Sequence, residues 1–156
     1  MDILFTGILI GLGGTIAMDL WALLLNRTLG QGLPNWGNVG RWVGHLPGRV
    51  FHDDIGAATP LPGETAIGWA FHYAVGIFYG VIFMLLVGPG WAAAPTFLPA
   101  WIFALVTIAA GWFLLQPGMG LGWALSRTET PMKGRAMGLV AHTVFGLGMW
   151  VTALIV

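Results

Sequence analysis

Four residues able to carry a proton, a hydrogen bond or a metal ion stand inside long apolar stretches: Asp19, His72, Gln116 and His142. The two histidines share one frame, Gly-x-x-x-His-x-x-x-Gly. Lipid tolerates ionisable groups only where they face the interior of a helix bundle and find partners there. An aspartate and two histidines at such positions therefore form a functional-site hypothesis, and the sequence does not say what binds or moves there.

The apolar stretches are long enough to cross a membrane. The chain is 57% hydrophobic and 8% charged, and a crossing helix needs roughly 20 mostly apolar residues. We predict an all-α polytopic membrane protein, one membrane domain over residues 1–156 with two helical hairpins. No basic leader precedes the first span, so we expect it to remain in the mature protein rather than act as a signal peptide. The four predicted spans are 3–25, 65–87, 97–125 and 135–156.

The basic residues predict the orientation in the membrane. All six lie at or between spans one and two or spans three and four. By the positive-inside rule both connections are cytoplasmic, and the N- and C-termini lie on the non-cytoplasmic side. These residues are too dispersed for nucleic-acid binding. The absence of cysteine excludes disulfides, thiolate metal sites and iron–sulfur clusters. The basic residues are Arg27, Arg41, Arg49, Arg127, Lys133 and Arg135.

We expect the four polar residues to share one layer in the membrane. Asp19, His72 and His142 each lie about seven residues from the cytoplasmic end of a span, roughly 10–12 Å deep, and Gln116 has a comparable depth. The first three also lie on stripes of small residues, which let membrane helices approach closely. The stripes comprise Gly7, Gly11 and Thr15 on span one, Gly68, Gly76 and Gly80 on span two, and Gly138 and Gly146 on span four.

Span three contains Gln116-Pro117-Gly118-Met119-Gly120. Pro117 removes a backbone donor and clashes one turn back, so the pattern predicts a kink or an opened turn. The carbonyls freed there are tolerated only if they are buried in protein or line a cavity. Met18 and Met119 would flank the polar layer with sulfur.

The two Gly-His-Gly frames indicate a parallel internal repeat, whose first half has the longer cytoplasmic loop, residues 26–64. Within this loop, helical spacing predicts a short helix lying on the membrane interface, anchored by Trp36 and Trp42. His52-Asp53-Asp54 would be a metal cluster or, more in keeping with its flexible setting, a solvated loop. The apolar face of the helix comprises Val39, Trp42, Val43 and Leu46.

Four motifs resemble a bacterial four-helix membrane family described only as a domain of unknown function, DUF2938. The resemblance spans nearly the whole chain and implies placement in the bacterial inner membrane, but it implies no activity. The motifs are Met18-Asp19-Leu20-Trp21, Gly40-Arg41-Trp42-Val43-Gly44-His45, His72-Tyr73 and Gln116-Pro117-Gly118-Met119-Gly120.

The residues leave three functions open. In the first, the polar residues are interhelical hydrogen-bonded pairs, and the protein is a non-catalytic accessory or scaffold subunit that contacts another membrane protein or a second copy. In the second, Asp19 and the histidines move protons or ions in a transport component. In the third, His72 and His142 bind haem, chlorophyll or, with Asp19, a transition metal. The sequence contains no Ser–His or Cys–His nucleophile pattern, which argues against catalysis.

Overall fold

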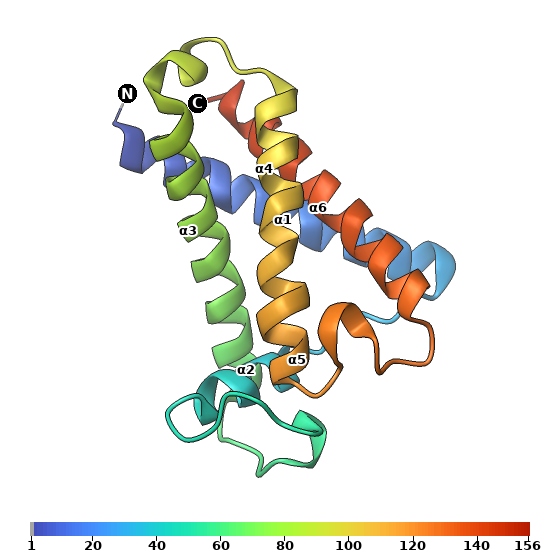
Figure 1. Ribbon diagram of the computed structural model, residues 1–156. Coiled ribbons are helices and arrows are strands. Elements are labelled where there is room, and N and C mark those ends of the chain that lie inside the picture. The colour runs from blue at the N-terminus through green and yellow to red at the C-terminus, as the bar shows by residue number, and fades with distance from the viewer. Residues whose placement is uncertain (1) are drawn as a thin grey trace. The chain divides into compact units, whose positions relative to one another are not determined.

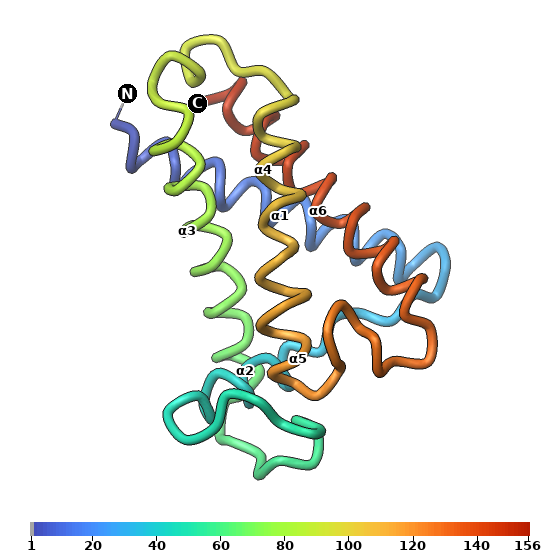
Figure 2. The backbone as a smooth tube through the Cα atoms, in the orientation of Figure 1, coloured from blue at the N-terminus to red at the C-terminus, as the bar shows by residue number. Residues whose placement is uncertain are grey.

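The computed structural model describes residues 2–156 and has only helices and loops there, which confirms the all-α prediction. Figures 1 and 2 show the order of the elements. The longer helices are α1 (Ile3–Leu29), α2 (Trp36–His45), α3 (Glu64–Ala93), α4 (Phe97–Ala110) and α6 (Pro131–Ala153). The short turns are η1 (Ile55–Ala57), η2 (Gly111–Leu115), α5 (Gln116–Gly118) and η3 (Trp123–Leu125).

Four helical segments within residues 2–156 are long and apolar enough to cross a membrane, as expected for a multi-pass membrane protein: Ile3–Leu29, Glu64–Ala93, Phe97–Gly118 and Pro131–Ala153. The second is interrupted at Gly88, where φ is 73° and ψ is 179°. The third ends at Gly118, although the sequence predicts a span to residue 125. Apolar residues continue beyond Gly118, but the backbone there turns out of the helix.

The chain forms two compact units. The first comprises residues up to Leu33, Tyr73–Thr107 and Leu139–Val156, and the second comprises Pro34–His72 and Ile108–Gly138. Three of the long helices contribute to both units, because the boundaries fall within α3, α4 and α6.

In the first unit, glycines allow α1 and α3 to approach closely. A Cβ added to Gly11 would clash with the carbonyl oxygen of Gly76, and one added to Gly80 would lie 2.6 Å from the Cα of Gly11. Helices in this arrangement are held by van der Waals contact between backbones. Thr15 is 1% exposed and bonds within its own helix, its hydroxyl donating to the carbonyl oxygen of Gly11 at 2.8 Å.

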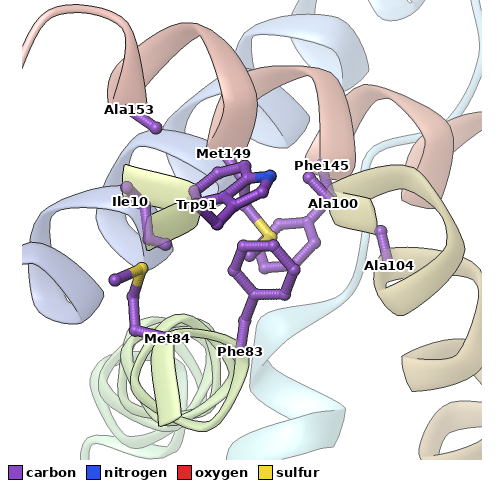
Figure 3. Close-up of a cluster of buried hydrophobic side chains, with 9 residues drawn as sticks. All are labelled: Ile10, Phe83, Met84, Trp91, Ala100, Ala104, Phe145, Met149 and Ala153. Atoms are coloured by element: carbon purple, nitrogen blue, oxygen red, sulfur yellow. The ribbon is translucent and has the colours of Figure 1, made fainter. Parts of the chain in front are cut away.

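The core of the first unit combines side chains from α1, α3, α4 and α6 (Figure 3). The rings of Phe83 and Trp91 meet edge to face, with centroids 4.7 Å apart, an arrangement that aromatic quadrupoles favour. Met149 is fully buried in the same cluster, and the partly buried Met18 packs against the cluster. The cluster comprises Ile10, Phe83, Met84, Trp91, Ala100, Ala104, Phe145, Met149 and Ala153.

The second unit contains the predicted short helix, α2. The Asn35 side chain caps its start by accepting a hydrogen bond from the backbone N–H of Asn38 at 3.0 Å, a standard N-cap arrangement. Trp42 differs from the expectation of an interfacial anchor: it is 2% exposed, and its indole N–H donates to the carbonyl oxygen of Val50 at 2.8 Å. Its bulk fills the core of the second unit, so it is not available to lipid.

We predict that Gly80→Ala lowers the free energy of unfolding by about 1–3 kcal/mol, because the added methyl forces the α1–α3 contact apart. Gly90→Ala is the matched control on the same helix: nothing lies within 4 Å of its added Cβ, so we expect a change within about 0.5 kcal/mol. Unfolding in mixed detergent micelles measures both values. Equal effects of the two substitutions would contradict the close α1–α3 contact.

Candidate functional site

Asp19, on α1, receives a hydrogen bond within the first unit. The Tyr73 hydroxyl, on α3, donates to Asp19 Oδ2 at 2.9 Å, and both residues are half-buried. A carboxylate that accepts a hydrogen bond from a phenol is partly compensated for leaving water. The contact therefore joins α1 to α3 through a polar pair next to their glycine stripes.

His72, on α3 in the second unit, lies against two tryptophans. Its ring stacks on Trp36 with centroids 4.1 Å apart and an interplanar angle of 29°, and it meets Trp69 edge to face at 5.9 Å. The space next to Gly68, one turn earlier, is also occupied: a Cβ there would clash with the carbonyl oxygen of Trp36 and lie 3.1 Å from the backbone nitrogen of Gly40. The start of α2 thus covers this part of α3.

The glycines around His142 face the third membrane-capable helix. A Cβ on Gly138 would lie 3.3 Å from Ile108 Cδ1, within the second unit. A Cβ on Gly146 would lie 3.0 Å from Ala104 Cβ, within the first unit. The helix contacts next to this histidine are therefore made by ordinary apolar packing.

Gln116 follows an opened helical turn, as the sequence predicts. Residues Gly111–Leu115 form a π-turn, and the backbone N–H of Gln116 bonds to the carbonyl oxygen of Gly111, five residues earlier. Such turns occur where the regular ladder is interrupted, often at functional sites. The Gln116 side chain leaves its Oε1 buried without a hydrogen-bond partner among residues 2–156. Buried acceptors of this kind are uncommon.

The chain after Pro117 leaves the helix in a Schellman motif. The N–H of Leu121 donates to the carbonyl oxygen of Gln116 at 2.9 Å. The N–H of Gly120 donates to the carbonyl oxygen of Pro117 at 3.1 Å. Gly120 supplies the left-handed conformation, with φ 91°, which glycine adopts without steric cost. These bonds satisfy two of the carbonyls that a helix end leaves without partners.

The loop before α3 satisfies the next two carbonyls. The N–H of His52 donates to the carbonyl oxygen of Gly118 at 2.9 Å, and that of Ile55 donates to the carbonyl oxygen of Met119 at 3.1 Å. Figure 2 shows this loop as the cyan-to-green trace next to the end of α5. The contact requires glycine at 118, because an added Cβ would lie 2.9 Å from Trp42 Cε2 and 3.1 Å from the Val50 carbonyl oxygen.

Arg41 holds the same loop from the side of α2. Its guanidinium forms a two-point pair with the Glu64 carboxylate, Nε to Oε2 at 2.8 Å and Nη2 to Oε1 at 2.7 Å. Nη1 also donates to the carbonyl oxygens of Gly56 at 2.8 Å and Ala58 at 3.2 Å. The hydrogen bond to Glu64 raises the pKa of Arg41 above its ordinary value. Paired charge-assisted bonds fix geometry as well as adding energy.

Sequence reasoning did not identify the role of Arg41. One signal for it was present: Arg41 lies off the apolar stripe of a short helix, and Glu64 opens the next helix. Arg41 also bonds to backbone carbonyls, which every residue has. Side-chain types therefore could not predict which carbonyls it contacts.

The His52-Asp53-Asp54 segment is exposed at Asp53 and Asp54, as expected for a solvated loop, but His52 is buried. His52 is 8% exposed, its Nε2 lies 3.2 Å from the Arg49 carbonyl oxygen, and its ring meets that of His45 at 5.6 Å. Asp54 caps η1 by accepting from the N–H of Gly56 at 2.8 Å. Within residues 2–156, no group of three or more His, Cys, Asp or Glu side chains could hold a metal ion.

The structure assigns the four polar residues to different units. Asp19 and His142 belong to the first unit, and His72 and Gln116 belong to the second. The shared polar layer therefore stays a prediction. Within the first unit Asp19 contacts Tyr73, and within the second unit His72 contacts Trp36 and Trp69.

Comparison with known proteins identifies the family. The sequence profile described as "Protein of unknown function (DUF2938)" matches residues 8–156, so the chain belongs to this family. No curated protein and no solved structure matches the chain.

We predict that Arg41→Gln opens the loop between α2 and α3, because it removes the pairing with Glu64 and weakens the bonds to the carbonyls of η1. Proteinase K should then cleave residues 46–63 several-fold faster than in the unaltered protein. Arg27→Gln is the control, because it makes the same change at an exposed arginine outside this loop, and exposed charges contribute little. Equal cleavage of the two variants would refute the role of Arg41.

The two tyrosines of the chain provide a matched test of the Asp19 contact. We predict that Tyr73→Phe destabilises the protein by about 1 kcal/mol, the scale of interhelical hydrogen bonds in membranes. Tyr79→Phe removes the other phenolic hydroxyl, which lies near the aromatic core without the Asp19 contact, and should change stability much less. Unfolding of both variants in mixed micelles measures the change in stability. A Tyr73→Phe variant as stable as the unaltered protein would contradict a stabilising hydrogen bond to Asp19.

Proposed function

We propose that this member of the DUF2938 family is a non-catalytic accessory or scaffold subunit of a membrane assembly. The observation that carries the proposal is that side chains able to do chemistry are used in packing. Asp19 accepts the Tyr73 hydroxyl at 2.9 Å, and the His72 ring stacks on Trp36 at 4.1 Å. Groups used in this way hold helices together, as polar residues commonly do in membranes.

We further propose that the protein lies in the bacterial inner membrane, with four crossings and both termini on the non-cytoplasmic side. The positive-inside rule supports this orientation, because the six basic residues all lie at or within the two proposed cytoplasmic connections. All of them except Arg27 belong to the second unit. The loops of the second unit would then lie on the cytoplasmic side of the membrane.

The second unit offers a surface for a partner. Val50 is 38% exposed and Phe51 is 55% exposed, although the backbone on either side of them is fixed. Arg49 Nε donates to the Phe51 carbonyl oxygen at 2.7 Å, and the N–H of His52 donates to the carbonyl oxygen of Gly118. Exposed apolar side chains on a fixed backbone favour docking, because little ordering remains to oppose it. The partner would be another membrane protein or a second copy of the chain.

A transport component is the second candidate function. It is favoured by the Oε1 atom of Gln116, which is buried and has no partner within residues 2–156, next to a π-turn and Pro117. An acceptor in this position would receive a hydrogen bond from a water molecule or coordinate a passing cation. Under this alternative, the opened turn would supply the flexibility that gating needs.

The cofactor alternative rested on glycines that clear space for a macrocycle on either side of His72 and His142. At Gly68, Gly76, Gly138 and Gly146 the place of an added Cβ has close protein neighbours instead. The glycines therefore no longer favour a tetrapyrrole over packing. Metal binding by His72, His142 and Asp19 stays a proposal, because these residues belong to different units.

We predict that the full-length tagged protein, mildly solubilised from its own membranes, migrates in native electrophoresis as a species larger than the monomer. Phe51→Ser should shift it to the monomer, because the variant removes the exposed ring from the docking surface. Leu33→Ser is the control, an exposed apolar residue of similar exposure, 53%, outside the second unit. A monomeric unaltered protein, or equal effects of the two variants, would contradict the proposal.

Two further measurements distinguish the cofactor and transport alternatives from the scaffold role. A Soret band or stoichiometric metal that disappears in His72→Ala or His142→Ala would establish the cofactor function instead. Proton flux in reconstituted vesicles, abolished by Asp19→Asn while assembly is retained, would establish transport.

A further inference from the structure

Residues 119–135, which connect the third and fourth membrane-capable helices, contain a turn that ordinary side chains rarely adopt. Ala124 and Leu125 are the two non-glycine residues with positive φ within residues 2–156, at 46° and 63°. This conformation crowds the Cβ atom of an L residue. Strained backbone persists only where its surroundings hold it, and it clusters at ligand-binding sites. Figure 1 shows this connection in orange, between α5 and α6.

The start of α6 holds the turn in place. Arg135 Nε donates to the carbonyl oxygen of Ala124 at 2.8 Å. A Cβ added to Gly134 would lie 2.5 Å from Leu125 Cδ1, so the two elements pack closely. Three backbone hydrogen bonds, each 3.0 Å long, complete the turn between residues 121 and 128. The turn and the start of α6 therefore form one fixed surface within the second unit.

This surface presents an exposed aromatic pair. Trp123 is 61% exposed and Phe113 is 50% exposed, and their ring centroids lie 5.7 Å apart. Phe113 belongs to the π-turn of the third membrane-capable helix, whereas Trp123 lies beyond the end of that helix. Tryptophan is enriched where the hydrocarbon core meets the lipid headgroups. If the helix crosses the membrane, the pair lies at that boundary.

Positive charge lies beside the aromatic pair. Arg127 and Lys133 are exposed. The aliphatic part of Arg127 packs over Gly122, next to Trp123 in the chain: a Cβ added to Gly122 would lie 2.8 Å from Arg127 Cγ. Residues 119–135 contain three basic residues and one acidic residue. Basic side chains at the membrane surface attract anionic lipids, each by about 1 kcal/mol.

We propose that this surface binds an anionic phospholipid, with Arg127 and Lys133 as its phosphate-binding side chains and Trp123 against the upper part of its acyl chains. The exposed rings favour a lipid over a free phosphate, because only a lipid has chains that bury them. The fixed turn lowers the cost of binding, since little ordering remains. The inference rests on the proposed membrane crossings, but it is independent of the scaffold role, because the surface does not include Val50 or Phe51.

Native mass spectrometry of the full chain in detergent tests this proposal. Phosphatidylglycerol and phosphatidylcholine with identical acyl chains are titrated separately, and the ratio of their dissociation constants gives the selectivity. We expect phosphatidylglycerol to bind more than about tenfold more tightly, and Arg127→Gln or Lys133→Gln to lower that ratio about fivefold, the scale of one basic residue. Arg27→Gln, at an exposed arginine outside the second unit, is the matched control and should leave the ratio unchanged.

Trp123→Ala tests the aromatic part of the surface. It should weaken binding of both lipids and leave their ratio unchanged, because the ring would contact chains that the two lipids share. Unchanged binding of both lipids in this variant would overturn the role of Trp123.

Three other results would overturn the lipid site itself. They are a ratio near one in the unaltered protein, equal loss in Arg127→Gln and Arg27→Gln, and displacement of the bound lipid by millimolar inorganic phosphate. Lipid adducts are counted on the mass of each protomer. A protein that fails to assemble would therefore contradict the scaffold role and leave this test intact.

Discussion

Backbone carbonyls at the end of the third membrane-capable helix must be hydrogen-bonded, and this requirement organises the second unit. Pro117 interrupts the ladder, and the chain then leaves the helix at Gly120. Two of the free carbonyls are satisfied by the turn itself, and the other two by the backbone of His52 and Ile55. Unpaired backbone groups are costly away from water. The loop between α2 and α3 is therefore part of the helix end, which explains why it is folded.

The four motifs quoted above from the sequence contact one another in pairs. Trp42, from the Gly-Arg-Trp-Val-Gly-His motif, packs against Gly118 of the Gln-Pro-Gly-Met-Gly motif. Asp19, from the Met-Asp-Leu-Trp motif, accepts the hydroxyl of Tyr73 in His-Tyr. The first contact lies within the second unit and the other within the first. These contacts give the motifs a structural reason that holds whatever the protein binds.

The sequence predicts the helices well because run length and composition alone determine them. It places the third helix end seven residues too late, since the left-handed conformation of Gly120 has no counterpart in the apolar pattern, which continues to Leu125. The sequence does not predict the burial of His52, because the bonds that fold the loop join backbone groups, and Arg41 reaches carbonyls that every residue has. Trp42 was interpreted as an anchor because aromatic type alone does not distinguish burial in protein from burial in lipid. The contact of Asp19 with Tyr73 depends on how α1 and α3 are rotated about their own axes. The spacing of residues in one sequence does not determine that rotation.

The amide exchange rates of the loop test the central claim most directly. If the loop completes the helix end, the backbone N–H groups of His52 and Ile55 exchange slowly with deuterium, because each is held by a carbonyl of the Gly118–Met119 pair. The amide of Asp53, between them in an exposed part of the loop, should exchange much faster. Residue-resolved exchange measured by NMR in nanodiscs would show this contrast. Rapid exchange at His52 and Ile55, equal to that of Asp53, would mean that the loop is solvated and that the helix end is satisfied in another way.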